Sequence, residues 1–212
     1  MCKKVEEIIR RLRKEIEVDW FLARGDPFQV LIRTVLSQRT RDENTDKASR
    51  RLFSRFKTPR EIVKANVKEI EELIRPSGFY RVKALRVKEI SREILGRFGG
   101  RVPDNIEDLV SLPGVGRKTA NCVLVYAYKM HALPVDTHLH RIPNRIGLVK
   151  TKEPEETERA LAKIVPKKHW VVINELFVKF GQRICKPIRP ECYRCPIVDL
   201  CGFEKKNLKG KS

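Results

Sequence analysis

The sequence predicts an all-α protein. Apolar residues recur at a helical period through most of the chain, which is typical of amphipathic helices. No stretch sustains the alternation of apolar and polar residues that a half-buried strand requires. Glycine and proline interrupt the pattern, for example at Gly25-Asp26-Pro27 and at Gly99-Gly100. These interruptions divide the chain into a series of short helices.

The apolar stripes give the elements in chain order. The first is formed by Val5, Ile8, Ile9, Leu12 and Ile16, and the second by Phe28, Leu31, Ile32, Val35 and Leu36. The later stripes are formed by Ala120, Val123, Leu124 and Ala127, and by Ile173, Leu176, Phe177 and Phe180. Each stripe predicts a helix that buries one face. Cys122 lies inside the third stripe and is expected to be a small core residue.

The charge of the chain indicates a polyanionic partner. Among 212 residues, Lys and Arg number 46 and Asp and Glu number 27, so the formal net charge is +19. A solvated surface like that of heat-tolerant proteins would explain the charged content, but not its one-sided sign. Nucleic acid is therefore favoured. No window resembles a membrane span or a secretory signal, so we expect a soluble cytoplasmic protein with reduced cysteines and no membrane partner.

Four cysteines near the C-terminus suggest a metal centre. Cys185, Cys192, Cys195 and Cys201 follow the spacing C-x6-C-x2-C-x5-C. Four thiolates can hold an iron–sulfur cluster or a zinc ion. Structural zinc usually takes two short knuckles, and only Cys192 and Cys195 form one here. The spacing favours a cluster over zinc, and both over a pair of disulfides.

A turn rich in glycine predicts a contact with an anion. The turn is Leu112-Pro113-Gly114-Val115-Gly116, and a new helix is expected to start at about Arg117. Gly114 and Gly116 allow a partner to approach the backbone closely. The N–H groups at a helix start favour an anion, and the charge balance makes DNA phosphate the expected one. The alternative is an ordinary connection between two helices.

Lys118 is expected in the first turn of that new helix. A cation there faces the positive end of the helix dipole and neighbours Arg117, and both disfavour the ammonium form. If the site is also partly desolvated, the free amine can act as a nucleophile. The alternative is that Lys118 contacts a phosphate.

Asp136 in Pro134-Val135-Asp136-Thr137-His138 precedes another predicted helix. It can cap that helix by accepting from its N–H groups. It can also assist deprotonation of an amine and stabilise positive charge on a sugar ring. Further polar residues follow on the same helix, namely His138, His140, Arg141 and Arg145. We expect phosphate or supporting contacts from these residues, because no third ligand accompanies the histidines.

Together these motifs resemble endonuclease III, a family of bifunctional DNA glycosylases and abasic-site lyases in the helix–hairpin–helix superfamily. The resemblance runs from about Val5 to Cys201 and covers nearly the whole chain. It rests on L-P-G-V-G-R-K-T-A at 112–120, V-D-T-H at 135–138, R-x-x-N-R at 141–145 and the run of four cysteines.

The resemblance implies a fold and a chemistry. It implies a six-helix barrel over residues 20–131, a second domain made of residues 1–19 and 132–212, and a DNA cleft between them. Lys118 matches the lysine that attacks C1′ of a damaged nucleotide, and Asp136 matches the aspartate that assists it. The cysteines match the ligands of a [4Fe–4S] cluster. The expected protein is a monomer of the prokaryotic nucleoid that acts on double-stranded DNA with damaged pyrimidines or abasic sites.

The resemblance also assigns residues to DNA binding. Phe79 matches a side chain that wedges into the duplex, although it could instead be a buried aromatic at a helix start. Arg39 stands where the family often has Gln, so the base preferred opposite the lesion is not copied from relatives. Either Gln38 or Arg39 is expected to enter the void left by the extruded base. Lys186 and Arg189 are expected to present cations to the DNA backbone.

Two other functions remain open at this stage. A mismatch-directed glycosylase of the same fold would remove a base without using a lysine. A non-catalytic DNA-binding protein would use the hairpin and the metal module alone. Lys118 favours the lyase, because an amine can form a Schiff base with the sugar and lead to β-elimination.

Overall fold

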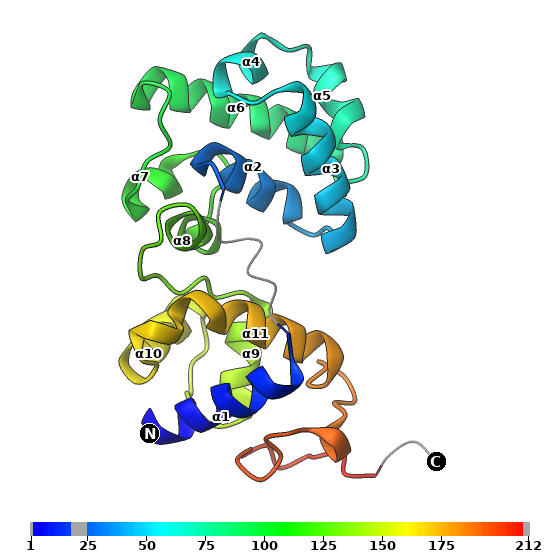
Figure 1. Cartoon of the computed structure of the whole chain (residues 1–212), viewed down its shortest axis with the longest axis vertical. Helices are drawn as coiled ribbons and strands as arrows, with labels where there is room; N and C mark the ends of the chain where they lie inside the picture. The colour runs from blue at the N-terminus through cyan, green and yellow to red at the C-terminus, as the bar shows by residue number, and fades with distance from the viewer. Residues whose placement is uncertain (1, 18–24, 210–212) are drawn as a thin grey trace. The chain divides into compact units, whose positions relative to one another are not determined.

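The computed structural model describes residues 2–17 and 25–209. These residues form helices and loops, with no strand among them, which confirms the all-α prediction (Figure 1). None of the helices in these ranges is long and apolar enough to cross a bilayer. In chain order the helices are α1 (Cys2–Glu15), α2 (Pro27–Ser37), α3 (Asp42–Arg55), α4 (Pro59–Lys64), α5 (Val67–Ile74), α6 (Tyr80–Phe98), α7 (Ile106–Ser111), α8 (Arg117–Tyr126), α9 (Thr137–Arg145), α10 (Pro154–Ile164), the 3₁₀ helix η2 (Lys167–His169), α11 (Trp170–Arg183) and the 3₁₀ helix η3 (Cys192–Arg194).

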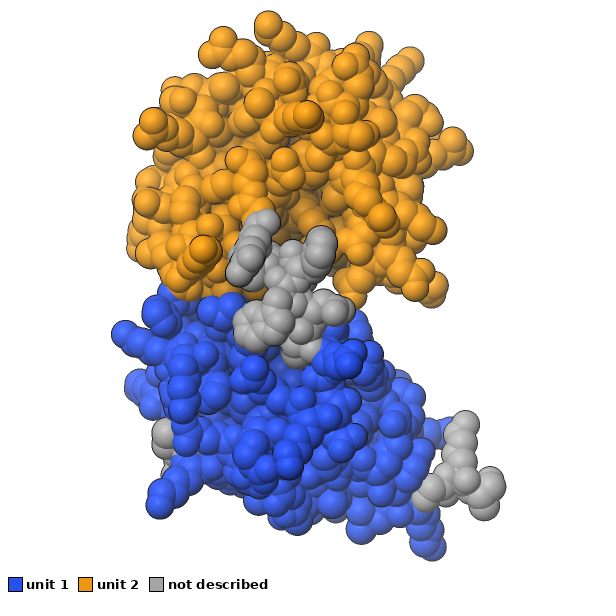
Figure 2. Space-filling model, viewed as in Figure 1, with its two compact units in different colours: residues 1–20, 131–212 blue, residues 21–130 orange. Residues whose placement is uncertain are grey.

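The chain divides into two compact units (Figure 2). Unit 1 comprises residues 1–20 and 131–212, and unit 2 comprises residues 21–130. Unit 2 contains α2 to α8, and unit 1 contains α1, α9 to α11 and the cysteine segment. The domain boundary that the sequence predicts at residue 20 lies outside the described residues.

Unit 2 is built around α6, its longest helix. α6 packs against α2, α4 and α5, and α2 in turn packs against α3 and α8. α6 stops at Gly99, whose φ of 60° is the left-handed conformation that ends many helices. α8 is buried on all sides from Thr119 to Tyr126, and Cys122 is only 3% exposed, as predicted. The turn that precedes α8 is therefore attached to a helix with little freedom to move.

The helix starts in unit 2 follow from local sequence. Asp26 accepts hydrogen bonds from the N–H groups of Phe28 and Gln29, and Pro27 takes the first position of α2. Thr58 and Glu61 form a capping box at the start of α4. Such caps satisfy N–H groups that have no partner within the helix.

Unit 1 has its own core, and the cysteine segment is part of it. Helix α11 packs against α1 and α9, and α10 packs against α9. The largest fully buried side chains in this core are Phe177 and Phe180. Ile197 and Cys185 belong to the same cluster. Arg11 of α1 also binds the segment, since its Nη1 lies 2.7 Å from the Asp199 carboxylate.

A buried serine in unit 2 gives a stability prediction. The Ser49 Oγ in α3 has no hydrogen-bond partner among the described residues. In contrast, Ser91 of α6 donates from Oγ to the Val87 carbonyl at 2.7 Å. We expect Ser49→Ala to raise the free energy of unfolding by about 0.5–1 kcal/mol, because it removes a desolvated hydroxyl and favours the helix.

Ser91→Ala is the matched control. It has the same gain in helix propensity but loses a hydrogen bond, so it should be less stable than Ser49→Ala by about 1 kcal/mol. Urea unfolding of the two variants measures the difference. A Ser49→Ala protein that is less stable than Ser91→Ala would contradict the assignment.

Candidate active site

A hairpin turn in unit 2 leads directly into α8. The N–H of Val115 donates to the Leu112 carbonyl at 3.1 Å and closes the turn. Gly114 has a φ of +65°, which an L side chain rarely adopts. Gly116 is the N-cap of α8 and has no side chain with which to cap it. A helix start of this kind is suited to binding an anion through backbone N–H groups.

The space beside Gly114 is occupied by a side chain of α6. A Cβ atom at position 114 would lie 1.6 Å from Nη1 of Arg86, a residue of α6. Arg86 therefore packs directly against the turn. A Cβ at Gly116 would meet nothing within 4 Å. The sequence did not reveal Arg86, because nothing local indicates that this part of α6 lies beside the hairpin.

Lys118 lies where the sequence predicted it, in the first turn of α8. Its side chain is half-buried, whereas that of Arg117 is exposed. The start of α8 is also joined to the end of α2. Nε2 of Gln38 donates to the Gly114 carbonyl at 3.1 Å and contacts Thr119 Oγ1 at 3.4 Å. Gln38 therefore supports the hairpin with its side chain.

Arg39 and Phe79 are both exposed and both have left-handed backbone angles. Their φ values are 52° and 58°. Phe79 is 64% exposed, so the interpretation of it as a buried aromatic is wrong. A bulky residue with positive φ is uncommon and is maintained only where its surroundings hold it.

Asp136 lies in unit 1 and caps α9. Its Oδ1 accepts from the N–H groups of His138 at 3.0 Å and Leu139 at 2.7 Å. The capping role that the sequence predicted is therefore confirmed. Capping fixes the carboxylate at the helix start, where the helix dipole favours its negative charge.

His138 packs tightly against α11. A Cβ at Gly181 would lie 2.2 Å from His138 Nδ1, so only glycine fits beneath this ring. Nδ1 also lies 3.2 Å from Nη2 of Arg141. Burial lowers the pKa of His138, while the Asp136 carboxylate opposes this shift and Arg141 adds to it.

His140 takes part in a polar network inside unit 1. Its Nδ1 lies 2.6 Å from Thr157 Oγ1, and Thr157 lies 2.6 Å from Thr151 Oγ1. Asn144 joins the network by donating to Thr151 Oγ1 at 2.9 Å. The network connects α9 to the start of α10, so this ring nitrogen has a structural role.

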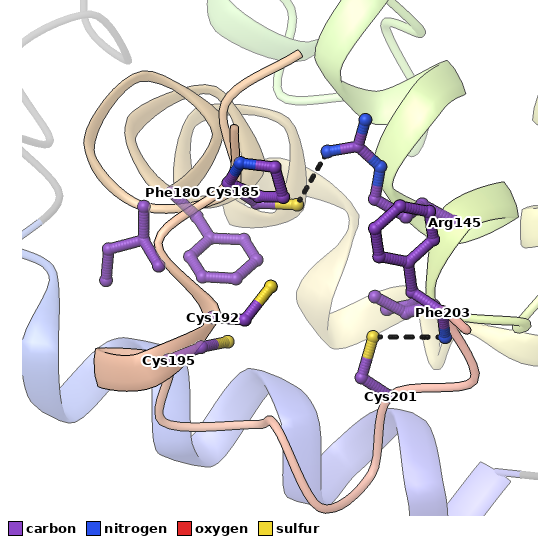
Figure 3. A pocket seen from close by; sticks show the side chains of 10 residues that line it. Arg145, Phe180, Cys185, Cys192, Cys195, Cys201 and Phe203 are labelled. Atoms are coloured by element: carbon purple, nitrogen blue, oxygen red, sulfur yellow. Dashed lines mark hydrogen bonds between the residues drawn. The ribbon is translucent and has the colours of Figure 1, made fainter. Parts of the chain in front are cut away.

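The two arginines of α9 hold the cysteine segment. Arg141 Nη1 donates to the Cys185 carbonyl at 2.7 Å. Arg145 donates to the carbonyls of Lys186 at 2.6 Å and Pro187 at 2.8 Å. Its Nη1 also lies 3.6 Å from Cys185 Sγ (Figure 3). Both guanidinium groups therefore position the segment.

The predicted cations of the segment itself differ from each other. Lys186 Nζ forms an ion pair with Glu191 at 2.5 Å. Arg189 is exposed and has a φ of 51°. Of the two, Arg189 is the more accessible to a partner.

The four cysteines line a single hollow. Figure 3 shows Cys185, Cys192, Cys195 and Cys201 around it, with Phe180 and Phe203 among the apolar walls. The hollow, counted together with the solvent into which it opens, measures about 290 Å³. All four thiols are free, so the disulfide alternative is wrong. Within the described ranges, no three His, Cys, Asp or Glu side chains form a group that could hold a single metal ion.

The chemistry of these donors fits a metal cofactor bound through sulfur. Burial raises the pKa of Cys195 to about 11 and also raises the pKa of Cys201. Such thiols become thiolates when a metal supplies positive charge. Four sulfur donors suit an iron–sulfur cluster.

Comparison with known proteins identifies the class. Residues 32–167 match the HhH-GPD superfamily, described as base excision DNA repair proteins. The chain is 52% identical to endonuclease III of Thermotoga maritima over 98% of this chain and 96% of that protein. It is 35% identical to endonuclease III of Bacillus subtilis over 89% of this chain and 87% of that protein.

Solved structures agree with the sequence comparison. The fold matches that of a trapped endonuclease III–DNA covalent intermediate with a TM-score of 0.85 and 32% identity, over 95% of this chain and 96% of that one. It matches a thermostable thymine-DNA glycosylase with a TM-score of 0.83 and 27% identity, over 95% of this chain and 96% of that one.

The chain is thus a member of the HhH-GPD superfamily, a DNA-binding enzyme of base excision repair. It belongs, more narrowly, to the endonuclease III family of DNA glycosylases and lyases.

The two glycines of the hairpin should respond differently to alanine. Gly114→Ala should lower the free energy of unfolding by about 1–2 kcal/mol from the left-handed backbone alone, and it must also displace Arg86. Gly116→Ala should change stability by less than about 1 kcal/mol, but it should weaken DNA binding because the methyl group blocks close approach of a phosphate. Thermal unfolding and a DNA-binding titration of each variant measure both effects.

The double variant Gly114→Ala, Arg86→Ala separates the two causes in Gly114→Ala. Its free energy of unfolding should exceed that of Gly114→Ala, because the clash with Arg86 is gone. It should stay below that of the wild-type protein, because alanine still has the left-handed backbone angle. Equal stability of Gly114→Ala and the wild-type protein would contradict this description of the turn.

Proposed function

We propose that the chain removes oxidised or ring-damaged pyrimidines from duplex DNA and cleaves the abasic site on its 3′ side. The observation that carries the proposal is a half-buried lysine, Lys118, in the first turn of a helix that follows a glycine hairpin. The relative trapped as a covalent intermediate with DNA supports an enzyme that bonds to its substrate. We propose that the enzyme acts as a monomer in the cytoplasm, at the nucleoid.

Lys118 is the proposed nucleophile. As the Lys118 Nζ forms a bond to C1′, the bond from C1′ to the damaged base breaks and the base leaves with a proton. Opening of the sugar ring gives a protonated Schiff base between Nζ and C1′. This electron sink allows loss of a C2′ proton, and the C3′–O bond then breaks. Water then adds to C1′ and the bond from C1′ to Nζ breaks, which frees Lys118 and leaves a 3′ unsaturated aldehyde beside a 5′ phosphate.

Asp136 is the proposed assistant in this reaction. Its carboxylate is fixed at the start of α9 by two backbone hydrogen bonds to Oδ1. A negative charge held in this way can accept a proton from an amine and stabilise positive charge on the sugar. In unit 1, His138 lies next to it and would help to keep the first turn of α9 in place.

DNA binding is assigned to exposed groups of each unit. The hairpin residues Gly114, Gly116 and Arg117 would bind backbone phosphate, and Arg189 would bind phosphate from the cysteine segment. Phe79 would wedge into the duplex and Arg39 would face the unpaired base. Extrusion of a base costs a few kcal/mol, which a wedge residue helps to offset.

The remaining candidates are assigned supporting roles. Gln38 would support the hairpin from α2. The side chains of His140, Arg141, Arg145 and Lys186 already bind groups of unit 1. We therefore propose that they shape the DNA-facing surface and do not contact phosphate directly.

We propose that Cys185, Cys192, Cys195 and Cys201 bind a [4Fe–4S] cluster. When bound, the cluster would crosslink the segment through four thiolates and would supply no redox step in base removal. Arg141 and Arg145 hold the backbone at Cys185 and at the two residues that follow it. The cluster would thereby fix the loop that carries Arg189.

The nature of the DNA ends tests the proposed reaction. Wild-type protein should cut a duplex that contains thymine glycol and leave a 3′ unsaturated aldehyde, since Lys118 forms the Schiff base. Lys118→Gln should lose strand cleavage by at least about 10³-fold, as expected when a nucleophile is removed. Lys129→Gln, at an exposed lysine beyond the end of α8, is the control and should cleave normally. Base release by the wild-type protein without strand cleavage would instead indicate a mismatch-type glycosylase.

Loss of a cysteine ligand tests the cofactor. Cys192→Ser should purify with less iron and less acid-labile sulfide, because serine is a poor ligand for iron–sulfur clusters. Its melting temperature should fall, and its DNA affinity should fall by about tenfold or more, since binding of a metal group is coupled to folding of its ligands. Cys122→Ser, which removes a buried thiol in unit 2, is the control. Full iron content in Cys192→Ser would rule out this ligand set.

A further inference from the structure

A buried lysine that the proposed reaction does not use lies near the start of α6. Lys83 is only 6% exposed. Its Nζ donates to the carbonyls of Leu36 at 2.7 Å and Gln38 at 2.6 Å. Thr40 Oγ1 at 2.8 Å and Ser77 Oγ at 2.9 Å also lie within hydrogen-bond distance of Nζ, so its three N–H groups are shared among four acceptors. All four of these acceptors are neutral oxygen atoms.

These acceptors belong to two loops, residues 36–40, which include the last two residues of α2, and residues 77–79. The loops also bind each other directly. The N–H of Gly78 donates to Thr40 Oγ1 at 3.1 Å, and Ser77 Oγ donates to the Leu36 carbonyl at 3.0 Å. The approach is close enough that a Cβ at Gly78 would lie 3.1 Å from the Arg39 carbonyl oxygen. Lys83 thus lies at the junction of two loops that are in contact.

Each loop carries one exposed residue with a left-handed backbone. Arg39 lies between two residues that bind Lys83, Gln38 and Thr40, and Phe79 lies two positions after Ser77. Positive φ costs a bulky residue about 1–2 kcal/mol. Hydrogen bonds from Lys83 to Gln38 and Thr40 hold Arg39 in that conformation. The hydrogen bond from the Gly78 N–H to Thr40 restricts the backbone next to Phe79.

Stability alone does not explain a charge at this position. Burial lowers the pKa of Lys83 to about 8, so the ammonium form that donates these bonds is maintained at neutral pH despite the cost of its desolvation. A buried cation without an acidic partner is expensive, and an apolar side chain of similar length would avoid the cost. A group that is costly to bury but fully hydrogen-bonded is expected where it fixes a particular geometry.

We infer that Lys83 is a positioning residue for reading the strand opposite the lesion, because it fixes Arg39 and Phe79 as one rigid pair. The inference rests on the proposed function, in which these two side chains enter the duplex. With the pair fixed, Phe79 fills the stack while Arg39 meets the unpaired base at a set distance and angle. Arginine donates hydrogen bonds and does not accept them, so it favours guanine, whose O6 accepts, over adenine.

The test compares Lys83→Met with Lys88→Met. Lys88 is a partly buried lysine on the same helix, and it donates to the Ala65 carbonyl, away from both loops. The kcat/KM of each protein is measured on duplexes with thymine glycol opposite guanine or adenine. Cleavage of a single-stranded oligonucleotide with a preformed abasic site is measured in parallel, because that substrate has no opposite base and needs no wedge.

Lys83→Met should lose about 10- to 100-fold in kcat/KM on the duplexes, as expected when reacting or reading groups are misplaced by about 1 Å. The ratio between guanine and adenine should fall toward one. Cleavage of the single strand should stay within about twofold of wild type, because Lys118 is untouched. Lys88→Met should keep the wild-type ratio and rates.

Several results would overturn the inference. One is a wild-type opposite-base ratio in Lys83→Met, and another is equal losses on duplex and single strand. If Lys83→Met does not fold, Thr40→Val tests the inference in its place. This variant removes one acceptor of Lys83 and the acceptor of the Gly78 N–H. Thr40→Val should also bring the ratio of kcat/KM between guanine and adenine toward one. An unchanged ratio in this folded variant would refute the inference. Wild-type protein without activity on any substrate would refute the proposed function itself, a result distinct from the others.

Discussion

The turn at Gly114 is the constraint on which the candidate active site in unit 2 depends. Its φ of +65° reverses the chain within a few residues, and Arg86 occupies the space that a side chain would need. The turn sets where α8 starts, and that start determines that Lys118 falls in the first helical turn. A lysine elsewhere on this buried helix would lie in the core. The position of the proposed nucleophile is therefore a consequence of backbone geometry.

Unit 1 uses the start of a helix in a comparable way. Asp136 caps α9 through Oδ1, so the same carboxylate both begins the helix and provides the proposed reactive charge. The far end of α9 holds the cysteine segment, because Arg145 binds the Lys186 and Pro187 carbonyls. One short helix thus connects the proposed catalytic aspartate to the proposed cluster. This connection explains how a segment with little regular structure can belong to the core of unit 1.

Features that depend on local pattern could be predicted from the sequence. The helical stripes, the cap at Asp136 and the helix start at Arg117 are confirmed, because each depends on residues within a few positions of one another. The roles of other residues depend on packing between distant segments. Gln38 was expected as a candidate for the void, but its side chain binds the hairpin 76 positions away. Arg145 was expected to make a phosphate or a supporting contact, and its partner in the cysteine segment, 41 positions away, could not be predicted.

Lys83 is the clearest case of a residue whose role depends on distant segments and could not be predicted from the sequence. Its place four residues after Phe79 gave no sign that it is buried or that it joins two loops. Its acceptors at Leu36 and Gln38 are 47 and 45 positions away in the sequence. An isolated charged residue near a helix start is normally read as exposed. Only the fold shows that it supports the two side chains proposed to enter DNA.

The most direct test of the account is to locate the bond between protein and DNA. The chain has 22 lysines, so the identity of the modified residue is informative. Wild-type protein is incubated with a thymine glycol duplex and sodium borohydride, the complex is digested, and the peptide that carries the sugar is sequenced by mass spectrometry. The account predicts a single modified residue, Lys118. A sugar bound to another lysine or to the N-terminal amine, with Lys118 unmodified, would contradict it.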